Sequence, residues 1–255
     1  MMQSVQNNFG YVVSVYGPPS QSVSFPAPNA AGNGLIVVAY FRIVWPTTSP
    51  NLAVSDSNGN SYLPIGACSV YSSNSGWRSY LAAWYVESCK AGANTVTVTE
   101  SVDTTSITYI LGVSVFEYAG GFGPLDVSAL GVTATQSTIS LTFSLSGASD
   151  LVFCYGASEG VRPTIAIDPS IRGFTTEQTE QIDNSLEPPY RIVELLAAQK
   201  VYYSPGVQTV TLDFSSSYIG GNSMLVAALP LNSPPPAPPA PPPVPGTPTG
   251  WPTIF

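Results

Sequence analysis

The stretch "GLIVVAYFR", residues 34–42, decides the fold class, because it is short, apolar and rich in β-branched and aromatic residues. Runs of this composition favour β-strands. Gly34 at the start of the apolar run and Pro46 after it are typical strand boundaries. Its core, Leu35–Phe41, is also the longest apolar run of the chain. A membrane-spanning helix needs about 18 apolar residues, so we expect no membrane span.

Segments of the same kind follow one another along the chain, each bounded by Gly, Pro, Asn or Ser, while helical periodicity is weak throughout. The stretch 191–203 is rich in Leu and Ala, which favour helices, but its Val and Tyr ends point to a strand. We therefore predict an all-β protein built as an antiparallel sandwich. The remaining strand-like segments are residues 11–16, 79–86, 94–101, 107–118, 137–145, 150–156, 207–214 and 223–231.

The strand-like segments repeat in order and spacing. Leu35 and Leu81 in the first half are separated by nearly the same distance in sequence as Leu151 and Leu196 in the second. This pattern predicts two pseudo-repeats of about seven strands each, as in an immunoglobulin-like sandwich or in the halves of a jelly roll. The sequence leaves open whether the halves are separate sandwiches or parts of one body.

The predicted organisation has three parts. Residues 1–122 form the first sandwich half and residues 123–232 the second, which contains a long polar connection at 158–189. Six acidic residues make that connection either a binding loop, a packing element or a plain solvated excursion. Residues 233–255 form an extended, proline-rich C-terminal tail.

Charge and composition restrict the partners. The formal net charge is −8 and the basic residues are scattered singly, which argues against a nucleic-acid partner. Charged residues make up only 9% of the chain, a share typical of extracellular fibre and shell proteins that pack against neighbours or glycans. The N-terminal stretch "MMQSVQNNFG" has no secretory pattern, so we expect either another route of export or earlier processing.

The chain contains no histidine, which removes the usual general base and the Ser-His-Asp and Cys-His arrangements. A glycosidase needs only two carboxylates, and Glu100, Asp103 and Glu117 lie close in sequence, but nothing selects a pair among them. We therefore predict a protein that is not an enzyme and that uses no cofactor.

The stretch "DSNGN", Asp56–Asn60, has oxygen-bearing side chains at alternating positions, as in calcium-binding loops. The bidentate glutamate of such a loop is absent, since Ala67 occupies its place. A hairpin turn explains the same residues, because Asn58 and Gly59 tolerate positive φ. We favour the turn and expect no metal site.

Three cysteines leave at least one unpaired. Cys154 lies in an apolar strand pattern and is expected to be a buried free thiol. Cys68 and Cys89 flank a predicted strand, and they could form a disulfide in an oxidising compartment.

Aromatic residues suggest a second kind of site. Trp77 lies in a Ser-, Asn- and Gly-rich stretch with Tyr71 and Tyr80 nearby, which is a candidate stacking platform for sugar rings. The alternative is that these rings close one end of the sandwich, as aromatic residues commonly do. Trp84, inside a strand, is expected in the core.

Four short motifs together resemble a β-sandwich module of bacterial secreted surface proteins and bacteriophage virion proteins. The matching positions are Asp56, Gly59, Asn60 and Tyr62; Trp84 and Tyr85; Ala91–Thr99; and Glu117, Tyr118 and Gly120. The resemblance covers about residues 32–120 and implies a scaffold without catalytic residues. The missing secretory pattern shifts the expectation toward a virion component.

The tail suggests an attachment device. In polyproline II geometry, residues 234–248 span roughly 45 Å at about 3.1 Å per residue. An apolar tip follows, and we predict that its residues Trp251, Pro252, Ile254 and Phe255 dock into a neighbouring subunit; the alternative is a disordered linker.

These observations predict a non-enzymatic structural protein of an extracellular assembly, and most specifically a bacteriophage virion decoration or fibre protein anchored through its tail. Its partners are then other protein subunits, and its location is the virion or the extracellular space. The alternative is a secreted carbohydrate-binding or adhesion module.

Overall fold

The computed structural model describes most of the chain and shows an all-β protein, as predicted. None of the described residues forms a helix long and apolar enough to cross a membrane. The described residues are 4–14, 19–44, 50–72, 77–101, 108–147, 149–160, 163–168, 172–184, 191–215 and 219–232.

The described residues form sixteen antiparallel strands, which divide into two sets of eight. The first set is β1 (Gln6–Ser14), β2 (Ser20–Ser24), β3 (Gly34–Val44), β4 (Leu52–Asp56), β5 (Leu63–Ser72), β6 (Trp77–Val86), β7 (Thr95–Glu100) and β8 (Tyr109–Tyr118). The second set is β9 (Val127–Thr133), β10 (Thr138–Leu145), β11 (Asp150–Gly160), β12 (Thr164–Ile167), β13 (Thr175–Asn184), β14 (Arg191–Tyr202), β15 (Gly206–Ser215) and β16 (Ile219–Pro230).

The pairing within each set is nested, which identifies a jelly-roll arrangement. In the first set β1 pairs with β8, β2 with β7 and β3 with β6, as if one long hairpin had been rolled up. The resulting sheets have the orders β1-β8-β3-β6-β5 and β2-β7-β4. Strand β5 departs from perfect nesting, because it pairs with β6 at the edge of the larger sheet and leaves β4 at the edge of the smaller one.

The second set repeats this topology strand for strand. Its sheets have the orders β13-β14-β11-β16-β9 and β10-β15-β12, which are the orders of the first set with eight added to each strand number. The internal repeat predicted from the sequence is therefore present, with eight strands per half instead of about seven. Of the two sandwich types considered, the structure has the jelly-roll type.

The sequence match between the halves is out of register in two places. Leu35 packs in the outer cluster of the first half, whereas Leu151 packs in the central cluster; Leu81 faces the centre, whereas Leu196 faces outward. Successive residues of a strand point to opposite faces, so the smallest correction is a shift of one residue. That shift matches Leu81 to Leu195 or to Ala197, which both face the centre, and Leu195 keeps the leucine.

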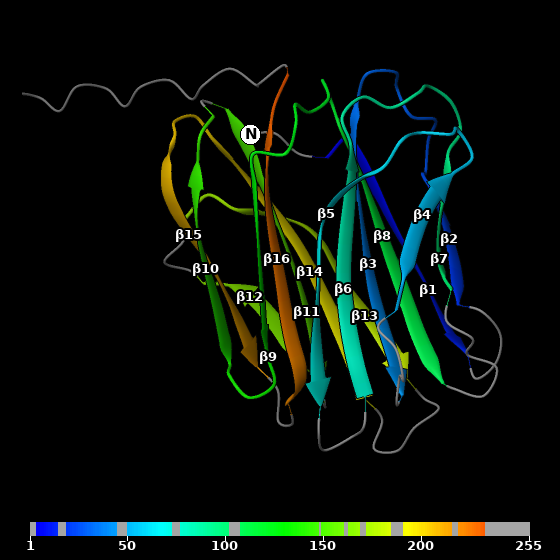
Figure 1. The fold of residues 1–255 in the computed structure, drawn as a ribbon, viewed down its shortest axis with the longest axis vertical. Helices are drawn as coiled ribbons and strands as arrows, with labels where there is room; N and C mark the ends of the chain where they lie inside the picture. The colour runs from blue at the N-terminus through cyan, green and yellow to red at the C-terminus, as the bar shows by residue number, and fades with distance from the viewer. Residues whose placement is uncertain are drawn as a thin grey trace, which may run out of the picture.

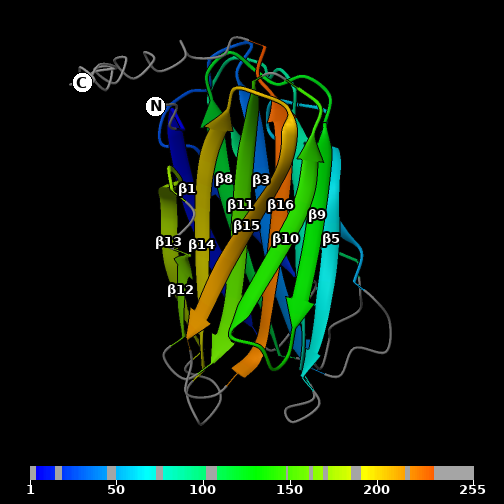
Figure 2. The ribbon, with the colours of Figure 1, turned by 90° about the vertical axis from the view of Figure 1, so that its left-hand side faces the viewer.

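The four sheets stack into four layers with the two five-stranded sheets in the middle (Figure 1). Each three-stranded sheet covers the outer face of one five-stranded sheet, and Figure 2 shows β10 and β15 in front of the five-stranded sheet of the second half. A central cluster lies between the five-stranded sheets and takes side chains from both halves. The halves are thus parts of one body rather than separate sandwiches.

The middle strands are buried on both faces, which explains their continuous apolar sequences. In β3, Leu35 and Val37 point into the outer cluster of the first half, while Ile36, Val38 and Tyr40 point into the central cluster. The same alternation places successive residues of β11 in the central and in the second outer cluster.

The expected long loop at 158–189 is not a single loop. Strand β11 continues to Gly160, and two further strands, β12 and β13, lie within the segment. Strand β13 forms the edge of its sheet beside β14 and pairs with it along its length, with one register shift between Thr176 and Gln178. The polar composition of β13 reflects this edge position, where one side of the strand faces solvent.

Candidate functional site

The carboxylate of Asp56 organises the turn after β4. Its Oδ1 accepts the backbone N–H of Asn60 (3.0 Å), and its Oδ2 accepts the Asn60 side-chain amide (2.7 Å), the Tyr62 hydroxyl (2.8 Å) and the Asn94 amide (3.0 Å). Burial by itself raises the pKa of Asp56, but these hydrogen bonds outweigh it and leave the pKa below its ordinary value. The carboxylate thus accepts four hydrogen bonds from the surrounding loops.

The turn interpretation of "DSNGN" therefore fits the structure better than a calcium loop, and Gly59 has a positive φ of 64°. The hairpin, however, is wrong: β4 pairs with β7 and β5 pairs with β6, so the turn carries the chain from one sheet to the other. The described residues contain no group of three or more acidic or cysteine side chains placed to hold a metal.

Glu117 plays a similar part at the end of β8. Its carboxylate accepts hydrogen bonds from the Gln6 amide, the Asn29 amide (2.8 Å), the Ala30 backbone N–H (2.9 Å) and the Asn33 amide (2.7 Å). Burial raises the pKa of Glu117, but the hydrogen bonds outweigh it and the net pKa is lowered. Two acids of the recognised motifs, Asp56 and Glu117, thus hold loops in place.

The acids considered for catalysis do not form a pair. Glu100 pairs across β7–β4 with Leu52, where β4 begins, and Glu117 pairs across β8–β3 with Leu35, where β3 begins. Because β3 and β4 run in opposite directions, these two positions lie at opposite ends of the first half. Glu100 accepts the backbone N–H of Asn51 (2.8 Å). The third candidate, Asp103, lies outside the described residues.

The proposed sugar platform is not assembled. Trp77 is only 3% exposed and Tyr80 only 8%, whereas Tyr71 is 44% exposed. The Trp77 ring instead packs against the guanidinium of Arg42, whose Cζ lies 3.7 Å from the ring centroid. Sequence reasoning took a Ser-rich neighbourhood as a sign of exposure, but the ring belongs to strand β6 and is covered by β3 and its neighbours.

All three cysteines are free thiols, so the disulfide considered between Cys68 and Cys89 is absent. Cys68 packs against the central cluster, whereas Cys89 belongs to the outer cluster of the first half. The five-stranded sheet lies between those clusters. Cys154 is buried, as expected. Burial raises the pKa of Cys68 to about 12, and burial together with the Glu117 charge raises that of Cys89 to about 11.

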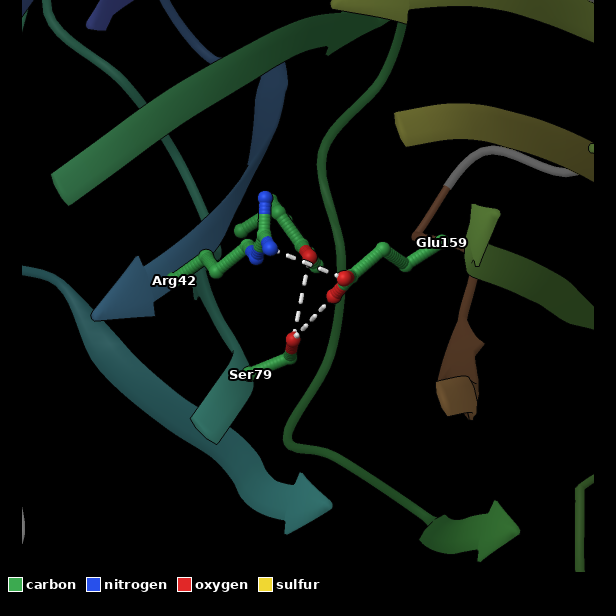
Figure 3. Close-up of polar contacts among 4 residues, drawn as sticks. Arg42, Ser79 and Glu159 are labelled. Carbon is green, nitrogen blue, oxygen red and sulfur yellow. Dashed lines mark hydrogen bonds and ion pairs between the residues drawn. The ribbon is translucent and has the colours of Figure 1, made fainter. Parts of the chain in front are cut away.

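A buried ion pair joins the two halves and was not anticipated. Arg42 on β3 and Glu159 on β11 meet with 2.9 Å between Nη2 and Oε1, and both side chains are at most 1% exposed. Ser79 donates to Glu159 Oε2 (3.3 Å), as Figure 3 shows. Ser79 is also hydrogen-bonded to the Tyr40 hydroxyl (3.1 Å). The available signal was a charged residue near the end of each of two largely apolar strands, Arg42 in β3 and Glu159 in β11.

The outer face of the first half contains an aromatic hollow. A three-stranded sheet cannot cover a five-stranded one completely, and β5 and β6 project beyond the edge strand β4. The gap holds a hollow of about 280 Å³, which we call the Trp84 hollow. Trp84 is half-buried there and not fully in the core as expected. The residues that define the hollow are Pro50, Leu52, Pro64, Tyr80, Ala82 and Trp84.

The four predicted docking residues, Trp251, Pro252, Ile254 and Phe255, lie outside the described residues. The described chain ends at Asn232, whose side-chain amide donates to the Phe122 carbonyl (2.9 Å). The tail therefore starts at the end of β16, beside the connection between the halves.

No protein-family model, curated protein or solved structure matches the chain. The resemblance to bacterial surface and virion modules stays a prediction.

Proposed function

We propose that this protein is a non-enzymatic structural component of an extracellular assembly, most specifically a bacteriophage virion decoration or fibre protein. Its body is the four-layer double jelly roll, and residues 233–255 attach it to other protein subunits. The proposed location is the virion surface.

The observation that carries this proposal is where the body ends. Among the residues that the structure describes, the sixteen strands and the three apolar clusters lie within residues 6–231, ahead of the proline-rich tail in the sequence. We assign attachment to the tail that follows these strands. Stiff proline-rich segments act as spacers that hold an end away from the body.

The use of the acids supports a passive role. Asp56 and Glu117, which the sequence motifs single out, have their carboxylates engaged by neighbouring amides and hydroxyls, and Glu100 lies at the other end of the first half from Glu117. Jelly rolls occur in viral shells and in lectins, so the fold is compatible with assembly but does not by itself select it.

The alternative is a secreted carbohydrate-binding or adhesion module. The observation in its favour is the Trp84 hollow, because aromatic faces suit sugar rings. This alternative predicts glycan binding that survives removal of the tail.

Deletion of residues 233–255 in the producing system separates these functions. The proposal predicts that the shortened protein is made with the same β-sheet circular dichroism spectrum but no longer co-purifies with assembled particles. Incorporation at the wild-type level without the tail would refute the proposal, and a positive glycan array with the shortened protein would favour the alternative.

A further inference from the structure

We propose that the Trp84 hollow is the receptor for the proline-rich segment 234–248 of a second copy of this chain. The inference rests on the proposed function, in which the tail attaches the protein to other subunits, and it names the partner and the surface. Two features support the inference. The first half has an aromatic hollow, and a neutral proline-rich segment follows the body in the sequence.

The lining has the chemistry that polyproline recognition uses. Extended proline-rich segments dock into grooves lined by aromatic rings, because their preformed geometry costs little entropy to order. Trp84, which is half-buried, supplies the accessible ring; Tyr80 also lines the hollow but is only 8% exposed, and Leu52 and Pro64 supply apolar walls. A proline-rich strand offers carbonyl acceptors but few N–H donors, and the Trp84 indole and the Tyr80 hydroxyl both carry donors.

Charge is matched as well. Residues 233–255 contain no Asp, Glu, Lys or Arg, so the net charge of −8 belongs entirely to the body, apart from the chain ends. The residues that line the Trp84 hollow are also uncharged. A neutral ligand in a neutral hollow avoids the desolvation of ionised groups, which is costly without a paired charge.

The two halves differ at this place, although they share a topology. When Leu81 and Leu195 are matched as inward-facing counterparts, Ala198 stands where the first half has Trp84, and Glu194 stands where it has Tyr80. Glu194 accepts the backbone N–H of Ile165 (3.1 Å). The aromatic lining is therefore a feature of the first half that the shared fold does not require.

The start of the tail favours a second copy over the same chain. β16 ends at Pro230, Asn232 is held by Phe122, and Pro234 follows two residues later. Proline-rich segments in general act as semi-rigid spacers, which favours a receptor on a second copy over β6 of the same body. When each chain supplies a receptor and a ligand, the contact is head-to-tail and generates a ring or a filament.

Photo-cross-linking of the full-length chain tests the contact directly. A benzophenone amino acid replaces the half-buried Leu52 in unlabelled protein, which is mixed with ¹⁵N-labelled full-length protein and irradiated. The expected products join position 52 of an unlabelled chain to residues 234–248 of a ¹⁵N-labelled chain. The same substitution at Val207, which is 69% exposed on β15 of the second half, is the matched control and is expected to give no tail cross-links.

The inference would be overturned if position 52 gave no cross-links to the tail. It would also be overturned if, in equimolar mixtures, position 52 formed cross-links only to the tails of unlabelled chains. A second measurement uses Trp84→Ala and, as control, Tyr71→Ala, whose ring is exposed on β5 outside the hollow. A synthetic peptide of residues 233–248 is expected to bind full-length Trp84→Ala at least about tenfold more weakly than wild type or Tyr71→Ala. Equal binding to the three proteins would contradict the proposal.

Two outcomes separate this inference from the proposed function. Loss of particle incorporation on tail deletion together with negative cross-linking refutes only the receptor assignment, because the tail then attaches elsewhere. Glycan binding that Trp84→Ala abolishes, with no peptide binding, assigns the hollow to carbohydrate and refutes the inference.

Discussion

The ion pair between Arg42 and Glu159 leads to a sharp prediction about stability. The two side chains come from different halves and are at most 1% exposed, and the Arg42 guanidinium lies on the Trp77 ring. Within the described residues, Arg42 Nε and Nη1 have no hydrogen-bond acceptor. Replacing Glu159 by Leu leaves a buried cation without its counter-charge, and replacing Arg42 by Met leaves a buried anion while keeping the apolar stem.

The expected loss is about 3–5 kcal/mol for either single substitution, which is the range for breaking a buried pair by removing one partner. The double variant Arg42→Met, Glu159→Leu removes both charges and fills similar volume. Its stability is expected to equal or exceed that of the wild type, by up to about 4 kcal/mol, because no desolvated charge remains. An exposed pair would contribute only about 0–1 kcal/mol, so the measurement distinguishes the two situations.

Guanidinium unfolding followed by circular dichroism measures the effect. With an m-value of about 5 kcal/mol/M for a body of this size, the single substitutions are expected to lower the midpoint by about 0.6–1 M. One transition is expected throughout, since the central cluster takes side chains from both halves. Single variants that lose less than about 1 kcal/mol, or a double variant less stable than both singles, would refute the buried-pair reasoning.

Three further predictions follow from individual contacts. Asp56→Asn should cost about 1–2 kcal/mol at pH 7, because the NH2 group that replaces one carboxylate oxygen cannot accept, so that one of the two N–H groups of Asn60 loses its acceptor. The lowered pKa of Asp56 means that its contribution is present above the unfolded pKa of about 4 and is lost as the pH falls through the folded pKa, so thermal melts from pH 7 to pH 2 should show a shallower decline for the variant. Gly34→Ala should cost about 1–3 kcal/mol, because its Cβ would lie 2.4 Å from the buried Phe122 ring, whereas Gly123→Ala, with a nearest contact of 3.4 Å, should be close to neutral in the same melts. Without reductant, all three thiols of the chain should react with Ellman's reagent in denaturant and much more slowly in the folded protein; only one reactive thiol in denaturant would contradict the free-thiol assignment.

Local features of the sequence determined much of the architecture. The β-branched runs such as residues 34–42 predicted strands, and the repeated order of segments predicted two related halves. Even the Leu- and Ala-rich stretch that becomes β14 was assigned correctly. These features are visible because side-chain shape, turn residues and strand spacing act within a few residues along the chain.

The strand register and the burial of individual side chains could not be predicted from the sequence. Leu35 and Leu151 appear equivalent by spacing but face different layers, because a shift of one residue changes the face of a strand without changing its composition. Trp77 lies in a polar neighbourhood in sequence yet is buried, because strands distant along the chain cover it. The residues next to a side chain in the sequence therefore do not show which residues surround it in the fold.

The sequence by itself thus determined that this chain folds as β-strands in two similar halves, and that it carries a neutral, proline-rich C-terminus. Only the tertiary structure decided that the halves share one central cluster, that Arg42 meets Glu159 there, and that β4 stops short of covering Trp84. The physical reason is that strand formation depends on local conformational preferences, whereas sheet order, layer contacts and the gaps between layers depend on pairings between residues far apart in the chain.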